Sequence, residues 1–217
     1  MVAVTEKLSE VRRILDRYIV EVVERFDLCP WAKSARTNGE VGIEVLWGEP
    51  TADQWVAAGQ ALIANPKTRV AMVVAPESAI TERDLREMRN VVTNGVPGTG
   101  VAHFYPTAPL DLASPPRLVP FLRRSPDPLL QLVPLALLES VRGIPEVPDR
   151  EMQAQMLKGG VPAQRGDVGD MIAETNHARV TADRAAMLAV LDDIAADRQR
   201  SYARVGITIT KQASEPA

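Results

Sequence analysis

Several features that would point directly to a function are scarce in this chain of 217 residues. It has a single cysteine, which cannot form an internal disulfide and is typical of a reducing compartment. No apolar run approaches the roughly 20 residues that cross a bilayer, and charges follow the first residue too soon for a signal peptide. A net charge of −3 without a basic block argues against nucleic-acid binding. We therefore expect a cytoplasmic protein that binds neither membranes nor nucleic acid.

The hydrophobic pattern predicts helices that alternate with strands. Apolar residues recur at three- and four-residue spacing through residues 5–26, as in an amphipathic helix with Thr5 as its N-cap. In chain order, we expect further helices at residues 51–64, 81–92, 135–142 and 181–202, and strands at residues 41–47, 68–75, 101–105, 129–133 and 206–210. Periodicity alone leaves open a single broken helix over residues 129–142.

These elements predict an α+β protein with a small mixed sheet of about four strands, covered by helices, and a C-terminal helical extension. Residues 1–143 would form the α+β core, and residues 144–217 a loop plus a C-terminal helix that packs on the same domain. The chain is long enough to bury such a core without disulfides or metal. Many of its 17 prolines lie between residues 97 and 148, and residues 158–169 are rich in glycine, so we expect loops there.

The densest group of reactive side chains lies in residues 27–36, just after the first predicted helix. This stretch contains Cys29, Trp31, Lys33 and Arg36. The C-terminus of the preceding helix would raise the pKa of the thiol, whereas the two cations or a second helix beginning after the cysteine would lower it. Cys29 is therefore a candidate nucleophile or thiol acid/base, and the aromatic and basic side chains beside it are candidate substrate contacts. A structural role also fits, because free cysteines commonly pack as small apolar residues.

The two histidines are the other candidates for acid–base or metal chemistry. His103 lies in a predicted strand two residues before Tyr105, so both share a strand face, and either could assist proton transfer with Cys29. Glu174 and His177 are three residues apart and, with His103, would supply the ligand set of a mononuclear iron site. No metal is favoured over the thiol interpretation, because a cysteine–histidine pair would use the same atoms.

Arg123 and Arg124 form a third candidate cluster in a turn that Pro126 and Pro128 restrict. Two adjacent arginines can bind a carboxylate or phosphate through paired N–H bonds, although a solvated turn would have the same composition. Residues 95–100 resemble a phosphate-binding loop only in their glycines, because a strand rather than a helix follows them.

Three motifs, taken in order, resemble those of a bacterial domain family of unknown function. The motifs here are Leu-Cys-Pro-Trp-Ala-Lys at residues 28–33, Phe-Tyr-Pro at residues 104–106, and Arg-Ser-Pro-Asp-Pro-Leu at residues 124–129, followed by an apolar strand. The family pattern is Leu-Cys-Pro-aromatic-Ala, then Phe-His-Pro, then Asn-Arg-Ser-Pro-x-Pro followed by x-Leu-His-Leu-Leu. The resemblance covers most of residues 5–143.

This resemblance implies a shared fold and a pocket near Cys29, Tyr105 and Arg124, but no reaction. Tyr105 and Gln131 stand where the family pattern has histidines, and Arg123 stands where it has Asn. If those histidines serve a metal or a base in the family, this chain lacks both. His103 would lie on the same strand face as Tyr105 and could substitute.

Together these residues favour an enzyme that modifies a small carboxylate- or phosphate-bearing molecule, in the manner of a thiol-dependent transferase or hydrolase. Cys29 would react, and the arginines would bind the anion. Two alternatives remain open: a non-catalytic ligand-binding or partner-docking protein, and a metal enzyme that uses His103, Glu174 and His177. The sequence identifies no cofactor and leaves homo-oligomer formation open.

Overall fold

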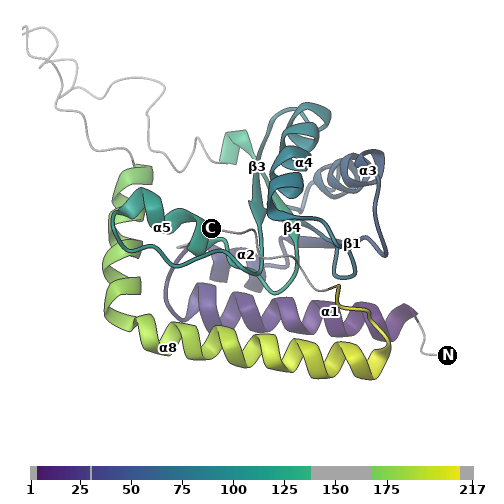
Figure 1. Cartoon of the computed structure of the whole chain (residues 1–217). Helices are drawn as coiled ribbons and strands as arrows, with labels where there is room; N and C mark the ends of the chain where they lie inside the picture. The colour runs from purple at the N-terminus through teal and green to yellow at the C-terminus, as the bar shows by residue number, and fades with distance from the viewer. Residues whose placement is uncertain (1–3, 30, 138–167, 211–217) are drawn as a thin grey trace, which may run out of the picture.

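The computed structural model describes residues 4–29, 31–137 and 168–210, and an open mixed sheet forms its framework (Figure 1). The strands are β1 (Val41–Val45), β2 (Val70–Val74), β3 (Thr99–Phe104) and β4 (Leu129–Pro134). Their spatial order is β1-β2-β4-β3; β1 and β2 run parallel, whereas β4 is antiparallel to both of its neighbours. The predicted α+β class with a four-stranded mixed sheet is confirmed.

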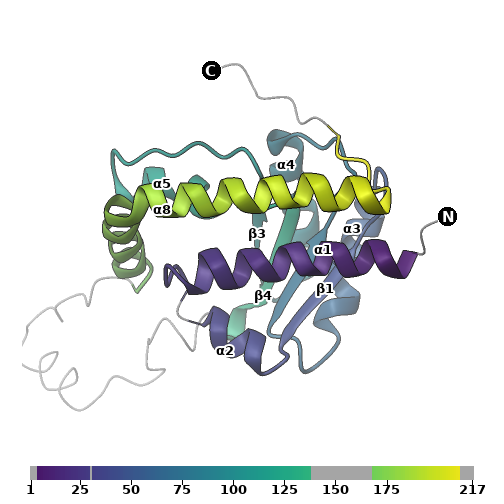
Figure 2. The same cartoon turned by 90° about the horizontal axis from the view of Figure 1, so that it is seen from below.

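One face of the sheet is covered by α1 (Val4–Tyr18), the π-helix η1 (Ile19–Glu24) and the long α8 (Val168–Val205). Figure 2 shows α1 and α8 side by side across this face. Alternate strand residues point toward these helices. The core that they close includes Val11, Ile14, Leu15, Met72, Val74, Leu129, Met187, Ile194 and Tyr202.

The opposite face packs against α3 (Ala52–Ile63) and α4 (Glu82–Gly95). Thr51 caps α3 with a reciprocal capping box: its hydroxyl accepts from the Gln54 N–H, and the Gln54 side chain accepts from the Thr51 N–H. This second core includes Trp55, Ala71, Val73, Leu85, Val92, Leu130 and Leu132. Both helices were predicted from the sequence, at residues 51–64 and 81–92.

Several predicted boundaries are wrong. Thr5 lies inside α1 rather than at its N-cap. The helix predicted at residues 181–202 corresponds to the part of α8 that follows a kink at Asp183, and the part from Val168 to this kink was not predicted. Residues 206–210 form no strand: the Ile207 N–H donates to the Tyr202 carbonyl after the helix ends at a glycine with positive φ.

One helix, α5, was missed, another, α2, was considered only as a possibility, and some predictions lie outside the described residues. Sequence reasoning treated the region of α5 (Pro115–Leu122) as loop because of its prolines, yet two of them occupy the first helical turn, where proline is tolerated. α2 (Ala32–Thr37) follows the cysteine. β4 rules out a single broken helix over residues 129–142. Most of the predicted helix at 135–142, the loops at 144–148 and 158–167, and the C-terminal residues 213–217 lie outside the described ranges.

A buried carboxylate joins α8 to the sheet. Asp127, just before β4, is fully buried; its Oδ2 accepts a hydrogen bond from the Tyr202 hydroxyl (2.6 Å), and its Oδ1 accepts one from Arg198 Nε (2.8 Å). The Arg198 guanidinium also lies over the Tyr202 ring, 4.9 Å from its centroid. The Ser125 hydroxyl donates to the Asp127 carbonyl and shapes the turn before the strand. This satisfied network sets where the C-terminal half of α8 lies on the sheet.

Asp127→Asn should lower the free energy of unfolding by about 3–5 kcal/mol, because it leaves the charge of Arg198 buried without a counter-charge. Urea unfolding followed by circular dichroism measures the loss. The control is Asp192→Asn, whose side chain on α8 is 75% exposed and should change stability by no more than about 0.5 kcal/mol. Equal losses in the two variants would refute the anchoring role of Asp127.

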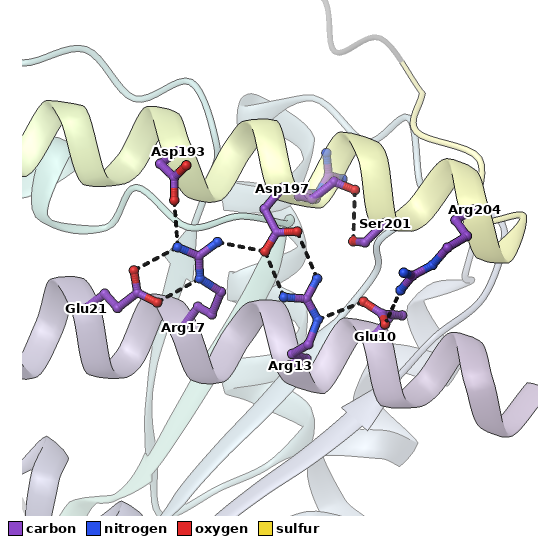
Figure 3. Close-up of polar contacts among 9 residues, drawn as sticks. Glu10, Arg13, Arg17, Glu21, Asp193, Asp197, Ser201 and Arg204 are labelled. Atoms are coloured by element: carbon purple, nitrogen blue, oxygen red, sulfur yellow. Dashed lines mark hydrogen bonds and ion pairs between the residues drawn. The ribbon is translucent and has the colours of Figure 1, made fainter.

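A ladder of ion pairs ties α1 to α8 along their exposed seam (Figure 3). Asp197 on α8 lies 2.7 Å from guanidinium nitrogens of both Arg13 and Arg17 on α1. Arg17 also pairs with Asp193 on α8 and with Glu21, each at 2.7 Å. The hydrogen bond from Arg13, reinforced by the one from Arg17, holds the pKa of Asp197 well below its ordinary value. The seam is therefore sensitive to acid.

The lowered pKa of Asp197 determines how the stability of the protein should change with pH. A carboxylate whose pKa is depressed by folding stabilises the folded state above its unfolded pKa of about 3.9, and the contribution is lost as the pH falls below that value. We expect the urea midpoint to fall between about pH 5 and pH 3, and Asp197→Asn to lose less over the same interval. Asp192→Asn is the matched control and should keep the wild-type slope. Identical pH slopes for Asp197→Asn and wild type would contradict this account.

Candidate functional site

A pocket of about 380 Å³ lies between the sheet and the segment that runs from η1 to α2, with Cys29 in its wall. Apolar side chains form most of this wall: from the helical side Ile19, Val23 and Leu28, and from the sheet Met72, Phe104 and Leu129. The volume and the apolar lining are typical of small-molecule sites. We call this cavity the Cys29 pocket.

The turn that carries Cys29 is held by side chains of α8. The helical run through η1 ends at Asp27, which adopts a positive φ of 49°, a conformation that Asp tolerates better than most residues. Arg179 of α8 donates to the Asp27 carbonyl (2.6 Å) and pairs with its carboxylate, and the Asn176 amide donates to the Leu28 carbonyl (3.0 Å). π-helical turns such as η1 are rare and occur frequently at functional sites.

The Cys29 thiol is kept protonated by its surroundings. Burial raises its pKa above the ordinary value, and the nearby Asp27 carboxylate acts in the same direction. Hydrogen bonds from the backbone N–H groups of Trp31 and Ala32, at the start of α2, oppose this effect but do not overcome it. The second helix after the cysteine, considered from the sequence, therefore exists, but burial dominates the electrostatics of the thiol.

Among the described residues of the pocket wall, formal charge is confined to one pair. Glu40 and Arg69 lie at the wall with 3.8 Å between carboxylate and guanidinium, so each partly neutralises the other. Gln131 of β4 adds an uncharged polar group. The described wall thus offers no unpaired cation to an anionic ligand.

The basic side chains near Cys29 do not line the pocket. Arg36 makes two hydrogen bonds to the Glu24 carboxylate, at 2.6 and 3.0 Å, and Lys33 is exposed. Trp31 does line the pocket, with 41% of its surface exposed, so it lies at the edge of the cavity. Of the substrate contacts predicted in this stretch, the structure brings Trp31 to the cavity and leaves Lys33 and Arg36 outside its wall.

His103 and Tyr105 lie on the opposite face of the sheet from Cys29. His103 is paired in register with Leu130, and Tyr105 packs in the core beneath α3 and α4, where its hydroxyl donates to the Ile80 carbonyl (3.1 Å). Phe104, between them, points into the Cys29 pocket instead. The predicted grouping of Cys29 with these two residues is wrong, because strand alternation places them across the sheet.

Arg123 and Arg124 are adjacent in the sequence, but their side chains lie in different surroundings. Arg124 donates to the Pro106 carbonyl (2.9 Å), and its guanidinium lies 4.0 Å from Asp192 of α8. Arg123, at the end of α5, lies near His103, whose pKa it helps to lower. Neither residue lines the Cys29 pocket, so the predicted shared site with Cys29 is not formed.

The alternative metal set does not assemble. Glu174 is exposed, His177 Nε2 lies 2.9 Å from the Leu112 carbonyl, and His103 faces α4. Over residues 4–29, 31–137 and 168–210, no group of three histidine, cysteine or carboxylate side chains could hold a metal ion.

Sequence reasoning missed the residues that complete the pocket and hold its turn. Gln131 and Val133 line the cavity because they alternate with the buried Leu130 and Leu132 along β4, a signal that was readable from the predicted strand. Arg179 contacts the Asp27 turn across about 150 residues of sequence, and no local pattern signals such a contact.

Comparison with known proteins adds no assignment: no family model, no curated protein and no solved structure matches this chain. Nor does any helix within the described ranges have the length and apolar character to cross a membrane.

Alkylation of Cys29 should report the raised pKa of the thiol. In the folded protein the rate with iodoacetamide should be low at pH 7 and should still rise above about pH 9, because the thiolate is the reacting species. In urea the profile should return to a midpoint near 8.5. With one cysteine in the chain, mass spectrometry follows the reaction without a mutant background. Faster reaction in the folded than in the unfolded chain at pH 7 would contradict the burial argument.

Proposed function

We propose that this protein binds a small, predominantly apolar molecule in the Cys29 pocket and does so in the cytoplasm. The observation that carries the proposal is the cavity of about 380 Å³ itself, whose wall is mostly apolar and is built from the sheet, η1 and α2. A pocket of this size and lining favours ligands that gain affinity from burying apolar surface, with a few polar groups fixing their orientation. The single cysteine supports the reducing compartment.

The charge pattern supports a neutral ligand over the small anion expected from the sequence. A carboxylate or phosphate in this cavity would find Arg69, the cation of the wall, already facing Glu40 at 3.8 Å. Binding there would require the anion to displace or approach a carboxylate, which costs Coulomb energy. Ser34, Gln131 and the thiol supply hydrogen bonds without net charge.

A thiol-dependent enzyme is the second candidate, and one observation favours it. The backbone N–H groups of Trp31 and Ala32, at the start of α2, act to lower the pKa of the Cys29 thiol and so favour its thiolate form, against the effect of burial. A bound ligand that brought a positive group beside the sulfur would complete the activation that burial opposes. A depressed thiol pKa in the alkylation profile described above would favour this transferase or hydrolase function over simple binding.

The binding proposal predicts a specific response to a neutral apolar probe. N-phenyl-1-naphthylamine should show increased fluorescence with the folded protein, and Val133→Trp should weaken its binding about tenfold, equivalent to about 1.4 kcal/mol. Val133 lines the cavity and is partly accessible, so the added ring would occupy ligand volume with little disturbance of the core.

The matched control is Val91→Trp, which adds the same ring to an exposed position of α4, outside the pocket wall. It should leave the dissociation constant within about twofold of wild type. Absence of probe binding to the native chain, or equal weakening by the two variants, would refute the proposal.

A further inference from the structure

A cluster of positive side chains lies on the α4 face of the sheet, away from the Cys29 pocket. Arg86 lies in the first half of α4, and Arg89 lies one helical turn later, at the middle of the helix. α4 packs along β3 and is joined to it by a short turn, so the two run antiparallel, and the start of α4 lies beside the end of β3, where His103 is found. The carbonyl of Arg123 accepts a hydrogen bond from the Tyr105 N–H, which places Arg123 at the same end of the strand.

The cluster lacks counter-charge in the described structure. α4 forms an ion pair between Arg83 and Glu87, and Arg124 lies near Asp192, but no described carboxylate pairs with Arg86 or Arg123. Arg89 donates to the neutral side-chain oxygen of Asn90 (3.0 Å). Arg123 is half-buried, and a cation removed from water without a partner is unfavourable.

His103 adds a polar group that also lacks a partner. Its Nδ1 is buried and has no hydrogen-bond partner among the described residues. When the proton of the neutral ring is on Nε2, Nε2 is the donor that can serve an oxyanion, and the buried Nδ1 is an acceptor that takes no part in binding the anion. Burial, followed by the charges of Arg123, Arg89 and Arg86, lowers the pKa of His103 to about 4, and the same arginines are thus within electrostatic reach of the ring.

We propose that Arg86, Arg89, Arg123 and His103 form a binding site for the phosphate group of a small molecule. Three guanidinium groups from two segments of the chain supply more than enough positive charge to balance a dianion, and each presents parallel N–H donors that fit phosphate oxygens. A bound phosphate would supply the counter-charge that the half-buried Arg123 lacks. The imidazole contributes a neutral donor at the same end of β3.

This site is independent of the proposed function. The Cys29 pocket lies against the sheet face that carries Phe104 and Leu129, whereas His103 and Leu130 lie on the other face. A neutral apolar ligand and a phosphate would therefore bind at separate places. Failure of one test leaves the other proposal standing.

Histidine NMR offers a direct test, because the chain has two histidines and one of them, His177, lies on α8 with its ring at the Leu112 carbonyl. Titration of the full chain with inorganic phosphate at constant ionic strength should shift the ring signals of His103 with saturation, and leave those of His177 unchanged. Acetate should shift neither set, because a monoanion matches the cluster poorly. A His103→Gln variant assigns the signals.

Charge-removing variants make the test specific. Arg123→Gln should weaken phosphate binding about tenfold or more, since a hydrogen-bonded charge pair is lost. Arg86→Gln, at an exposed position that tolerates substitution, should weaken it several-fold. Arg83→Gln removes the same charge from an exposed, ion-paired site on α4 and should change affinity by less than about twofold. An unsaturable His103 shift, an equal response to acetate, or equal losses for Arg83→Gln and Arg86→Gln would overturn the proposal.

Discussion

The buried contact of Asp127 with Arg198 and Tyr202 is the constraint on which the arrangement of the helices depends. It joins α8 to the turn that leads into β4, one of the two central strands of the sheet. With α8 placed, α1 is aligned by the ion pairs of Arg13 and Arg17 with Asp197. Each ion pair of that kind contributes little to stability. The buried contact therefore fixes the position of α8, and the ion pairs of the seam align α1 with it.

The placement of α8 reaches the Cys29 pocket through a second pair of contacts. Asn176 and Arg179 of this helix bind the backbone carbonyls of Leu28 and Asp27, immediately before the cysteine. The thiol is thus held by a helix that lies far away in the sequence. Its position, its burial and its raised pKa are consequences of tertiary packing rather than of the motif around it.

Because the surroundings of Cys29 depend on tertiary packing, the sequence predicts the local elements better than it predicts the site. The sheet, α1, α3 and α4 were predictable because their periodicity is local, as are the threonine caps of α3 and α4, and residues 27–36 did mark the pocket. The partners of Cys29 were not predictable. His103 and Tyr105 share a strand face, as their spacing indicates, but which core that face meets is set by the strand order β1-β2-β4-β3. Likewise, the pairing of Arg36 with Glu24 arises only when α2 folds against η1.

The sheet also separates two kinds of chemistry. On the α1 and α8 face, the pocket beside Cys29 is apolar and its formal charges neutralise each other. On the other face, the half-buried Arg123 has no carboxylate partner among the described residues, and the buried Nδ1 of His103 has no hydrogen-bond partner there. Leu129 and Leu130, adjacent in β4, point to opposite sides of this boundary. A one-residue shift of register in β4 would exchange the residues on its two faces, so the pairing of this strand with β2 and β3 is what places Leu129, Gln131 and Val133 in the pocket wall and Leu130 and Leu132 in the opposite core.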